Sequence, residues 1–344
     1  MKEKKVTFAD LAKRTGFSKT TISRYFNHPD TLTEESRVRI AGAIREVGYK
    51  ENKLAKVLAN GRTEIVGIIV PNLHMHYYAD LLSCVLNTAE KHGYKFLVFN
   101  GENDKERDRS AIRELLAYKA EGIIVISHTC TSEELSQLGI PVVTIEREDR
   151  YVNSVNSDNY EGGITAVSHL VSCGCEMLIH INADLNKVSP AYGRIMGFRN
   201  VAAKSGLPAK EYLTYLGNEY LEIKPKMESI LADIEKNYPG VKKGIFVSND
   251  TAAYVLVNLI LKRYKYLPDD YLIVGFDDSL ISRESVIPIT TIHQDIRTMA
   301  DTAMDLLVRQ MKDRTENKDW ASAPLEHRII KTELLVRETT IREP

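Results

Sequence analysis

The sequence predicts a small all-α head joined to a larger α/β body with two lobes, and three observations lead to this prediction. Helix caps and apolar spacing divide residues 1–51 into three short helices. From Thr63 onward, short apolar runs alternate with amphipathic stretches, as in α/β folds. Residues 1–62 carry 14 basic and 7 acidic side chains, a charge of +7, and the remainder carries −8, although the 344-residue chain has a net charge of −1. A basic head on an acidic body indicates a polyanion-binding module fused to a second domain.

The overall composition is that of an ordinary globular protein, with 43% hydrophobic and 27% charged residues. It excludes disordered, collagen-like and disulfide-stapled chains. Apolar runs such as Ile65–Val70 are too short to span a bilayer, and the charged N-terminus has no signal-peptide pattern, so we expect a cytoplasmic protein. We expect the four cysteines to be structural thiols, because Cys173-Gly-Cys175 lacks the two-residue spacer of a redox or zinc pair.

The first predicted helix begins after Thr7 and ends at Gly16. Thr7 and Asp10 have the spacing of a capping box, in which the threonine hydroxyl accepts a backbone N–H. Phe8 and Leu11 then lie on one helical face. Glycine can adopt the left-handed conformation that such a helix end needs.

The second predicted helix, Lys19–Phe26, begins after Ser18, which is a good N-cap residue. Ile22 and Phe26 give this helix an inner face, and three side chains point outward: Lys19, Thr20 and Arg24. A loop follows at 27–30.

The third predicted helix, Glu34–Val47, begins after the cap residue Thr33 and ends at Gly48. Four of its side chains are expected to be buried: Val38, Ile40, Ile44 and Val47.

Two short helices joined at a glycine, with the second exposing Lys, Thr and Arg, have the arrangement of a helix-turn-helix that enters the DNA major groove. Arg24 can contact guanine O6 and N7, Lys19 can contact guanine or phosphate, and Thr20 can reach a base edge or a thymine methyl. The hydroxyls of Ser18 and Thr21 suit phosphate. A three-helix protein-binding module is the alternative, and the charge of +7 favours DNA.

A hinge is predicted at 52–62, where Asn52 to Gly61 would form about two turns of a marginal helix. This helix could form when two copies pack on DNA. Its apolar side chains Leu54, Val57 and Leu58 would then pack between domains or wedge into the minor groove.

The head, Val6–Asn27 followed by Leu32–Thr63, closely resembles the head of LacI/GalR-family repressors. It contains the family's VTFADLA opening, the GFS before the recognition helix, the TISR within that helix, and an N-x-x-A-x-x-L hinge pattern. Two positions depart from the family, with Glu51 in place of the usual proline and Lys56 in place of a frequent arginine. The resemblance implies that Lys19, Thr20 and Arg24 read bases and that Leu58 inserts into the minor groove. The DNA-binding residues expected are Thr7, Ser18, Lys19, Thr20, Thr21, Ser23, Arg24, Asn27, Asn52 and Leu58.

The body is predicted to contain parallel sheets covered by helices on both faces, because continuous apolar strands alternate with helical stretches. So many β-α units favour two similar lobes over one sheet, with ligands bound at the carboxyl ends of the strands. The strands expected are Ile65–Val70, Lys95–Phe99, Gly122–Ile126, Pro141–Ile145, Met177–Asn182, Tyr212–Tyr215, Gly244–Val247 and Tyr271–Gly275. The helices expected include Tyr78–His92, Glu106–Tyr118, Glu161–Ser172, Gly193–Ser205 and Thr251–Tyr264.

The loops after these strands contain the side chains of a polyol site, in which aromatic rings stack on a sugar and carboxylates, amides and a guanidinium bind its hydroxyls. Arg194 is the strongest single candidate, because its charge needs a partner in a cleft. Other interpretations stay open: Tyr77 and Tyr78 would pack at a helix start, Asn249-Asp250 would cap a helix, and Asp278 would be a cap or solvated.

The body also resembles the LacI/GalR effector domain, which is similar to periplasmic sugar-binding proteins. The matching stretches are IPVVTIERE, VNSDNYEGG, YGRIMGF, VSNDTAA, IVGFDDS and PITTIHQDI. The resemblance implies contacts to the effector from Arg194, Asn249 and Asp277, and Glu146 stands where the family usually has aspartate. The effector-binding residues expected by this resemblance are Tyr77, Tyr78, Glu146, Arg194, Asn249, Asp277 and Ile296.

The expected domains are a helix-turn-helix head at 1–51, the hinge at 52–62 and an effector and dimerisation domain at 63–344. The chain is expected to cross between lobes near Asn159, Thr291 and Ala323. Lobe 1 would then contain 63–159 and 292–322, including a helix Gln294–Met311. Lobe 2 would contain 160–291 and 323–344, including a last strand His327–Val336.

The function expected is that of a transcription repressor of carbohydrate-utilisation genes, in which a homodimer binds a pseudo-palindromic operator. The effector would be a sugar, a sugar phosphate or a sugar acid, with no cofactor, metal or catalytic site. An enzyme is the first alternative, but no phosphate-binding or hydrolase motif occurs and His74-x-His76 has too few ligands for a metal. An extracytoplasmic sugar receptor is the second, and the basic head opposes it.

Overall fold

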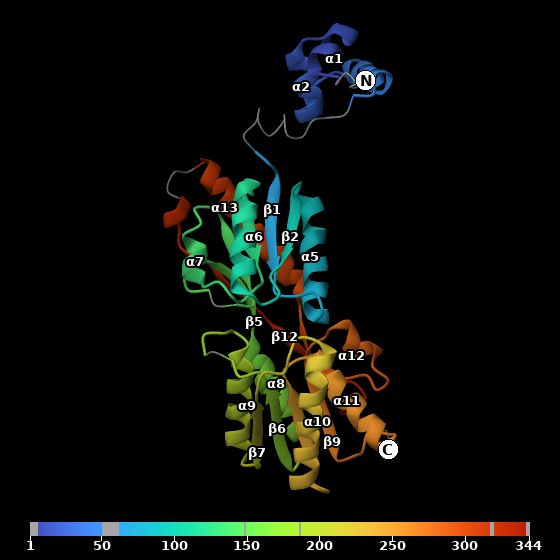
Figure 1. Ribbon diagram of the computed structural model, residues 1–344, viewed down its shortest axis with the longest axis vertical. Coiled ribbons are helices and arrows are strands. Elements are labelled where there is room, and N and C mark those ends of the chain that lie inside the picture. The colour runs from blue at the N-terminus through green and yellow to red at the C-terminus, as the bar shows by residue number, and fades with distance from the viewer. Residues whose placement is uncertain (1–5, 50–61, 148, 186, 317–319, 342–344) are drawn as a thin grey trace. The chain divides into compact units, whose positions relative to one another are not determined.

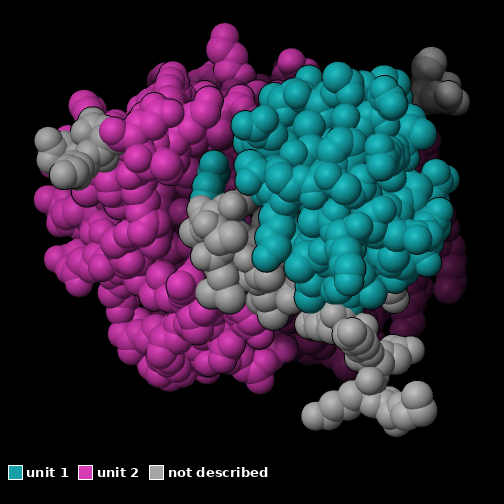
Figure 2. Space-filling view, turned by 90° about the horizontal axis from the view of Figure 1, so that it is seen from above, with its two compact units in different colours: residues 1–62 teal, residues 63–344 magenta. Residues whose placement is uncertain are grey.

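The computed structural model describes residues 6–49, 62–147, 149–185, 187–316 and 320–341 (Figure 1). The chain divides into two compact units, Met1–Arg62 and Thr63–Pro344, which are coloured separately in Figure 2. The predicted hinge helix lies outside the described residues, and so do Asn52, Leu58 and the two departures from the family pattern, Glu51 and Lys56.

Residues 6–49, the described part of the head, form three α-helices with a short 3-10 helix between the second and third. Thr7 and Asp10 form the capping box of α1, and Gly16 ends this helix with a φ of 76°. Gly48 ends α3 in the same way with a φ of 59°. The elements are α1 (Phe8–Thr15), α2 (Lys19–Asn27), η1 (Pro29–Thr31) and α3 (Glu34–Val47).

The core of the head is formed by one apolar face from each helix. Leu11, Ile22 and Ile40 are fully buried, and the rings of Phe8 and Phe26 stack with centroids 5.4 Å apart. The expected burial of Val38 is wrong, because this side chain is 59% exposed. Val38 and Ile40 are two positions apart and project to nearly opposite sides of a helix, so only one of them can face the core.

The first lobe of the body is a six-stranded sheet with the order β11-β5-β4-β3-β1-β2 and parallel pairing throughout. Its strands are β1 (Ile65–Val70), β2 (Lys95–Asn100), β3 (Gly122–Val125), β4 (Val142–Ile145), β5 (Asn153–Ser157) and β11 (His327–Ile330). Its helices are α5 (His76–His92), α6 (Lys105–Ala117), α7 (Ser132–Ser136), α13 (Ile296–Glu316) and the 3-10 helix η2 (Trp320–Ser322).

The second lobe is a six-stranded sheet with the order β12-β10-β9-β8-β6-β7, in which only the β10–β12 pair is antiparallel. Its strands are β6 (Met177–Asn182), β7 (Ala209–Leu213), β8 (Lys243–Val247), β9 (Tyr271–Asp277), β10 (Thr290–Gln294) and β12 (Thr332–Leu335). Its helices are α8 (Asn159–Ser172), α9 (Tyr192–Ser205), α10 (Tyr220–Asn237), α11 (Asp250–Tyr264) and α12 (Leu280–Glu284).

The central strands of both sheets are buried on their two faces. The neighbouring residues Ile68 and Ile69 of β1 belong to different apolar clusters, and so do Ile273 and Val274 of β9. Side chains of successive strand residues point to opposite faces, so each sheet has a core above and below it. This burial explains why central strands such as β1 and β9 read as nearly continuous apolar runs.

The chain crosses between the lobes through three connectors of one residue each. Asp158 joins β5 to α8, Asp295 joins β10 to α13, and Lys331 joins β11 to β12. The first and third crossings are adjacent, because the backbone N–H of Asp158 donates over 2.8 Å to the carbonyl of Ile330, the residue before Lys331. In Figure 1, β5 and β12 lie where the two lobes meet.

Two of the expected crossings differ from these positions. The second lies at Asp295 rather than near Thr291, because Thr290–Gln294 forms a strand of the second sheet and α13 begins only at Ile296. The third lies at Lys331 rather than near Ala323. The expected last strand, His327–Val336, is therefore two strands in different lobes, and the expected helix Gln294–Met311 begins two residues too early.

Strands β5 and β10 were not predicted from the sequence, because they are polar. The sequence of β5 is NSVNS, and every one of its residues is buried. Its polar side chains are satisfied inside the protein: Ser154 Oγ and Asn156 Nδ2 both donate to Asp149 Oδ2, over 2.8 and 3.1 Å. Buried polar groups are stable when they are hydrogen-bonded in this way, so burial did not require an apolar run.

Candidate DNA-binding surface and interlobe site

The candidate DNA-binding surface is the outer face of α2. Ser18 caps the helix, with its Oγ accepting the backbone N–H of Thr21 over 3.1 Å. Ile22 is fully buried and fixes the helix against the head. The side chains of Lys19, Thr20 and Arg24 are exposed, which leaves them accessible to a duplex.

The positive charges of the head are not equivalent. Arg14 pairs with Glu46 over 2.8 Å and Arg37 with Glu34 over 2.5 Å. Within the described part of the head, neither Lys19 nor Arg24 forms an ion pair. The charges of Lys19 and Arg24 on α2 are therefore available for phosphate or guanine.

Other predicted DNA-binding residues have structural roles or are half-buried. The Thr7 hydroxyl donates to Asp10 Oδ2 over 2.7 Å at the start of α1, and Thr21 Oγ1 lies 2.9 Å from Ser18 Oγ. Ser23 is half-buried. The side chain of Asn27 lies outside the described residues, although its backbone ends α2.

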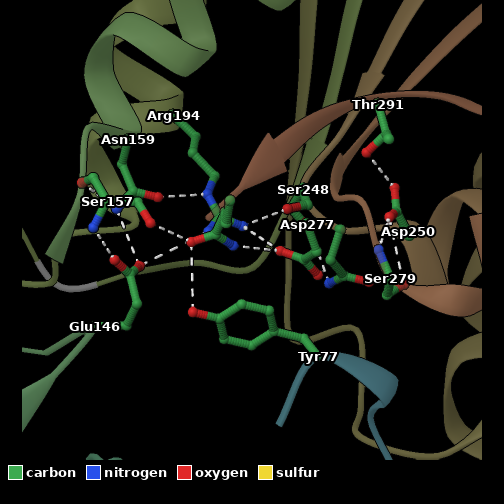
Figure 3. A network of polar contacts seen from close by, with 12 residues as sticks. Tyr77, Glu146, Ser157, Asn159, Arg194, Ser248, Asp250, Asp277, Ser279 and Thr291 are labelled. Carbon is green, nitrogen blue, oxygen red and sulfur yellow. Dashed lines mark hydrogen bonds and ion pairs between the residues drawn. The ribbon is translucent and has the colours of Figure 1, made fainter. Parts of the chain in front are cut away.

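The interlobe site is a network of polar side chains around Arg194, in the first turn of α9 (Figure 3). Arg194 Nε donates to Asn159 Oδ1 over 2.7 Å, and Nη1 donates to the carbonyl of Ser248 over 2.6 Å. The same guanidinium lies 3.9 Å from Glu146 of lobe 1 and 3.8 Å from Asp277 of lobe 2. Arg194 thus contacts both lobes.

Glycines set the position of Arg194 beside α8. A Cβ on Gly197 would lie 2.6 Å from the carbonyl oxygen of Tyr160, and one on Gly163 would lie 2.8 Å from that of Arg194. The backbones of α8 and α9 can approach so closely only because these residues lack side chains. This approach places Asn159, the first residue of α8, within hydrogen-bond distance of Arg194.

The two carboxylates of the network are buried, with Glu146 at 6% and Asp277 at 7% exposure. Glu146 follows β4 with a φ of 54° and accepts hydrogen bonds from the Ser157 backbone and from Asn159 Nδ2 over 3.0 Å. Asp277 ends β9 with a φ of 116°. Burial raises the pKa of Asp277 well above its usual value, and Arg194 opposes this rise.

Gln294 connects the network across the lobes. Its Nε2 donates to Asp277 Oδ1 over 2.7 Å, and its Oε1 accepts the Ser157 hydroxyl over 2.6 Å. The Tyr77 hydroxyl also reaches Gln294 Oε1, over 3.4 Å. Burial is the main reason that the pKa of Tyr77 lies well above its usual value, which keeps this hydroxyl protonated as a donor.

Three predicted effector residues lie outside this direct network. Asn249 caps α11 through its Oδ1, which accepts the backbone N–H of Ala252 over 2.9 Å, so the capping interpretation holds for its oxygen. Ile296 packs against the apolar cluster of lobe 1. The Tyr78 hydroxyl lies 3.5 Å from His128 Nε2.

Four contributors to the network were not predicted from the sequence: Ser157, Asn159, Gln294 and the carbonyl of Ser248. Ser157 and Gln294 end the two polar strands that it did not recognise, and both are buried. Placing these strands would have identified them, because ligand-binding side chains gather at the carboxyl ends of parallel strands.

A surface cavity of about 660 Å³ lies elsewhere, between α13 and β11, and none of the predicted effector residues lines it. Within the described ranges, no group of three or more His, Cys, Asp or Glu side chains is arranged to hold a metal ion. The helices described there include none that could cross a membrane.

Two family models match the chain. "Bacterial regulatory proteins, lacI family" matches residues 7–52, and "Periplasmic binding protein-like domain" matches residues 167–340. The chain belongs to the LacI family of bacterial regulatory proteins. It is therefore a DNA-binding transcription regulator, in a family of regulators rather than enzymes.

The relatives of this LacI-family chain match it along nearly their whole length. The sucrose operon repressor of Streptococcus mutans is 29% identical over 312 residues, covering 90% of this chain and 94% of that protein. The ribose operon repressor of Halalkalibacterium halodurans is 29% identical over 338 residues, covering 97% of each chain.

Solved structures share the fold of this LacI-family chain. The Lac repressor dimer bound to operator and the anti-inducer ONPF superimposes with a TM-score of 0.80 at 22% identity, covering 98% of this chain and all of that one. A periplasmic binding protein/LacI regulator from Alkaliphilus metalliredigens in complex with D-xylulofuranose gives 0.68 at 28% identity, covering 81% of this chain and all of that one.

Proposed function

We propose that this regulator is a homodimeric repressor of carbohydrate-utilisation genes, and that a neutral sugar bound between its lobes controls its affinity for a pseudo-palindromic operator. The observation that carries the proposal is the position of Arg194. Its guanidinium lies within 4 Å of a carboxylate from each lobe. A ligand that binds there contacts both lobes and changes the angle between them.

A neutral, hydroxyl-rich effector fits the charges of this site better than a sugar phosphate or a sugar acid. Among the described residues that act most strongly on Tyr77 and Asp277, the cation is Arg194, whereas Glu146 and Asp277 are both acidic. The two carboxylates accept hydrogen bonds from hydroxyls and repel anions. The relatives support a carbohydrate, since two are repressors of sucrose and ribose operons and one is bound to D-xylulofuranose.

The contacts of 3.8 and 3.9 Å from Arg194 to the carboxylates are longer than hydrogen bonds. A sugar hydroxyl can donate to Asp277 or Glu146 and accept from Arg194, which replaces these long contacts with short ones. The part of this gain that involves Glu146 exists only when the lobes close on the ligand, because Arg194 belongs to lobe 2 and Glu146 to lobe 1. The sugar therefore binds the closed state more tightly and shifts the population toward it.

Two protomers are proposed to pair through their bodies and to place two copies of α2 on adjacent half-sites. Large apolar side chains on lobe 2 support an interface between copies, because Leu221 and Val286 are 80% and 81% exposed. Effector binding and operator binding are then coupled, so the effect of each on the other's affinity is equal in size. Sedimentation of the purified chain tests the dimer.

The test of DNA recognition uses a duplex selected from a random library by the protein itself. Arg24→Ala is expected to lower the affinity for this duplex about tenfold or more, as the loss of a bidentate guanine contact does. Arg45→Ala, an exposed arginine on α3, is the matched control and should change it little. Equal effects of the two variants in fluorescence anisotropy would reject α2 as the base-reading helix.

The test of the effector class uses matched pairs of ligands. The protein is titrated with sucrose, with D-ribose and with the phosphorylated form of each sugar, and its melting temperature is measured. A ligand that binds the folded state raises the melting temperature. The proposal expects a neutral member to bind, and Arg194→Ala to abolish this binding. A shift produced only by the phosphorylated sugars would contradict it.

A further inference from the structure

The turn that follows β9 holds two consecutive non-glycine residues at positive φ. Asp277 has a φ of 116° and Asp278 a φ of 54°. Residues with a Cβ adopt this region at a cost in free energy and keep it where neighbouring contacts hold them. Asp277 belongs to the interlobe network, so the contacts of this turn determine where its carboxylate points.

Each end of the turn is held by a side chain from another element. Gln294 of β10 donates to the Asp277 carboxylate over 2.7 Å. At the other end, the backbone N–H of Ser279 donates to Asp250 Oδ2 over 2.9 Å. Asp250 is fully buried at the start of α11, so this end is fixed to the core of the lobe.

Asp278, in the middle of the turn, is held by a cation from the C-terminal segment. Its side chain is 10% exposed, so it is not solvated, and the cap residue of α12 is Ser279 rather than Asp278. The sequence expectation that Asp278 is a cap or solvated is therefore wrong. Arg337 Nη2 donates to Asp278 Oδ1 over 2.5 Å, and His293 Nδ1 lies 3.0 Å from Asp278 Oδ2. Arg337 Nη1 also donates to Ser282 Oγ and to the carbonyl of Ile289, over 3.1 and 3.0 Å.

Asp277 and Asp278 are bound by two different residues, which are neighbours in β10. His293 contacts Asp278 and Gln294 contacts Asp277, and successive side chains of a strand point to opposite faces. A displacement of Asp278 therefore has to be transmitted to Asp277 through their shared backbone, where both φ angles are positive.

Arg337 also connects the turn to a lobe crossing. It lies two residues after β12, the strand that begins directly behind the connector Lys331. Its backbone is fixed to the same strand as His293, because its N–H donates to the Thr290 hydroxyl over 2.8 Å. The guanidinium thus joins the segment that crosses between the lobes to the turn that carries Asp277.

We propose that Arg337 is a positioning residue of the effector site: by binding Asp278, it holds the turn in the conformation that directs the Asp277 carboxylate toward Arg194. This inference rests on the proposed function, because it assumes that Asp277 contacts the effector. Arg337 binds Asp278, Ser282 and Ile289, so its influence on the effector passes through the turn.

The test compares two arginines that approach the same carboxylate. Arg337 is 17% exposed and hydrogen-bonded to Asp278, whereas Arg283 is 56% exposed with its Nε 4.0 Å away. Arg337→Gln, Arg337→Lys and Arg283→Gln are titrated by calorimetry with sucrose, D-ribose, cellobiose and D-xylulose, and the wild-type ligand is compared across variants. We expect Arg337→Gln to weaken binding tenfold or more, Arg337→Lys to recover most of it, and Arg283→Gln to stay within twofold.

Hydrogen exchange of the 277–279 segment supplies a measurement that needs no ligand. Arg337→Gln should speed exchange there, and Arg283→Gln should not. Unchanged sugar affinity and unchanged exchange in Arg337→Gln would overturn the positioning role. An equal loss in Arg337→Gln and Arg337→Lys with a general rise in exchange across lobe 2 would also overturn it, because this result indicates a purely structural role.

The two proposals fail differently. If Arg194→Ala abolishes sugar binding while Arg337→Gln leaves it intact, the effector site stands and the positioning role falls. If the wild-type protein binds none of the four sugars, the neutral-sugar proposal falls. In that case, hydrogen exchange of the 277–279 segment alone tests whether Arg337 holds the turn.

Discussion

The guanidinium carbon of Arg194 lies 3.7 Å from the ring centroid of Phe276, the residue before Asp277. A cation above an aromatic face is stabilised by the ring's quadrupole, and more so when it is removed from water. Phe276 is fully buried, so its ring stabilises the Arg194 guanidinium in a place removed from water. Two consecutive residues of lobe 2 therefore stabilise the guanidinium of Arg194: Phe276 through its ring and Asp277 through its carboxylate.

Removal of this guanidinium is expected to destabilise the body in a pH-dependent manner. Arg194→Ala leaves Glu146 and Asp277 buried without their shared cation, and the loss of one partner from buried charges costs about 3–5 kcal/mol. The pKa of Asp277 then rises further, so this carboxyl takes up a proton and the loss is smaller at pH 5 than at pH 8.

Urea unfolding followed by circular dichroism at the two pH values measures this difference. Adding Asp277→Asn to Arg194→Ala is the control, and it should recover stability mainly at pH 8. An equal loss of stability at both pH values would show that the ionisation of the two carboxylates does not depend on Arg194.

Asp250 is expected to make the stability of the body fall as the pH rises. Burial raises the pKa of its carboxyl to about 7, against about 4 in an unfolded chain. The folded state binds the proton more tightly, so this contribution is complete below pH 4 and is lost as the pH rises through 7. One proton gives a slope of up to about 1.4 kcal/mol per pH unit within this window.

Asp250→Asn removes this titration and keeps the size of the side chain. The difference in unfolding free energy between wild type and variant should then slope between pH 4 and 7 and become flat above 8. A difference that is constant with pH would mean that Asp250 is ionised in the folded protein throughout.

Two glycine-to-alanine changes in helices are expected to have opposite effects. Gly197→Ala places a methyl 2.6 Å from the carbonyl oxygen of Tyr160, so α8 and α9 must separate and Arg194 loses its place beside Asn159. Gly42→Ala on α3 meets nothing within 4 Å and should stabilise this helix by about 0.5–1 kcal/mol. Hydrogen exchange should become faster in α8 and α9 for the first variant and slower in α3 for the second.

The two roles of Ser18 can be separated by two substitutions. Ser18→Ala removes the N-cap of α2 and should cost the head about 1 kcal/mol together with DNA affinity. Ser18→Asp keeps a capping oxygen and should restore the stability. Its negative charge should still weaken DNA binding, because the end of α2 would meet phosphate.

Calorimetry of the head and anisotropy with the selected duplex measure these two quantities. If Ser18→Asp binds DNA as tightly as the wild type, the start of α2 does not contact the phosphate backbone.

The sequence predicted most of this fold because local signals and tertiary structure agree in it. Thr33 and Gly48 delimit α3 at the predicted residues, and the apolar runs of β1 and β6 form strands with the expected bounds. The fold brings the predicted Arg194, Glu146 and Asp277 together, although Glu146 lies 48 positions before Arg194 and Asp277 lies 83 positions after it.

The parts that were missed share a physical cause. Strands β5 and β10 bury polar side chains that are satisfied only by distant partners, as Ser157 is by Gln294, and such pairing leaves no periodic apolar signal. The ion pair of Asp278 with Arg337 likewise joins residues 59 positions apart. Local sequence gives the type of an element, whereas the partners of a buried polar group depend on the complete topology.

The single-residue connectors Asp158, Asp295 and Lys331 limit how the body can respond to any ligand. Consecutive Cα atoms are 3.8 Å apart, so three such short links leave the sheets almost no freedom to translate away from each other. What remains is rotation: bending and twisting about axes that pass through these three points. We therefore expect that lengthening one connector by a few glycines would add sliding motions and uncouple ligand binding from the orientation of the lobes.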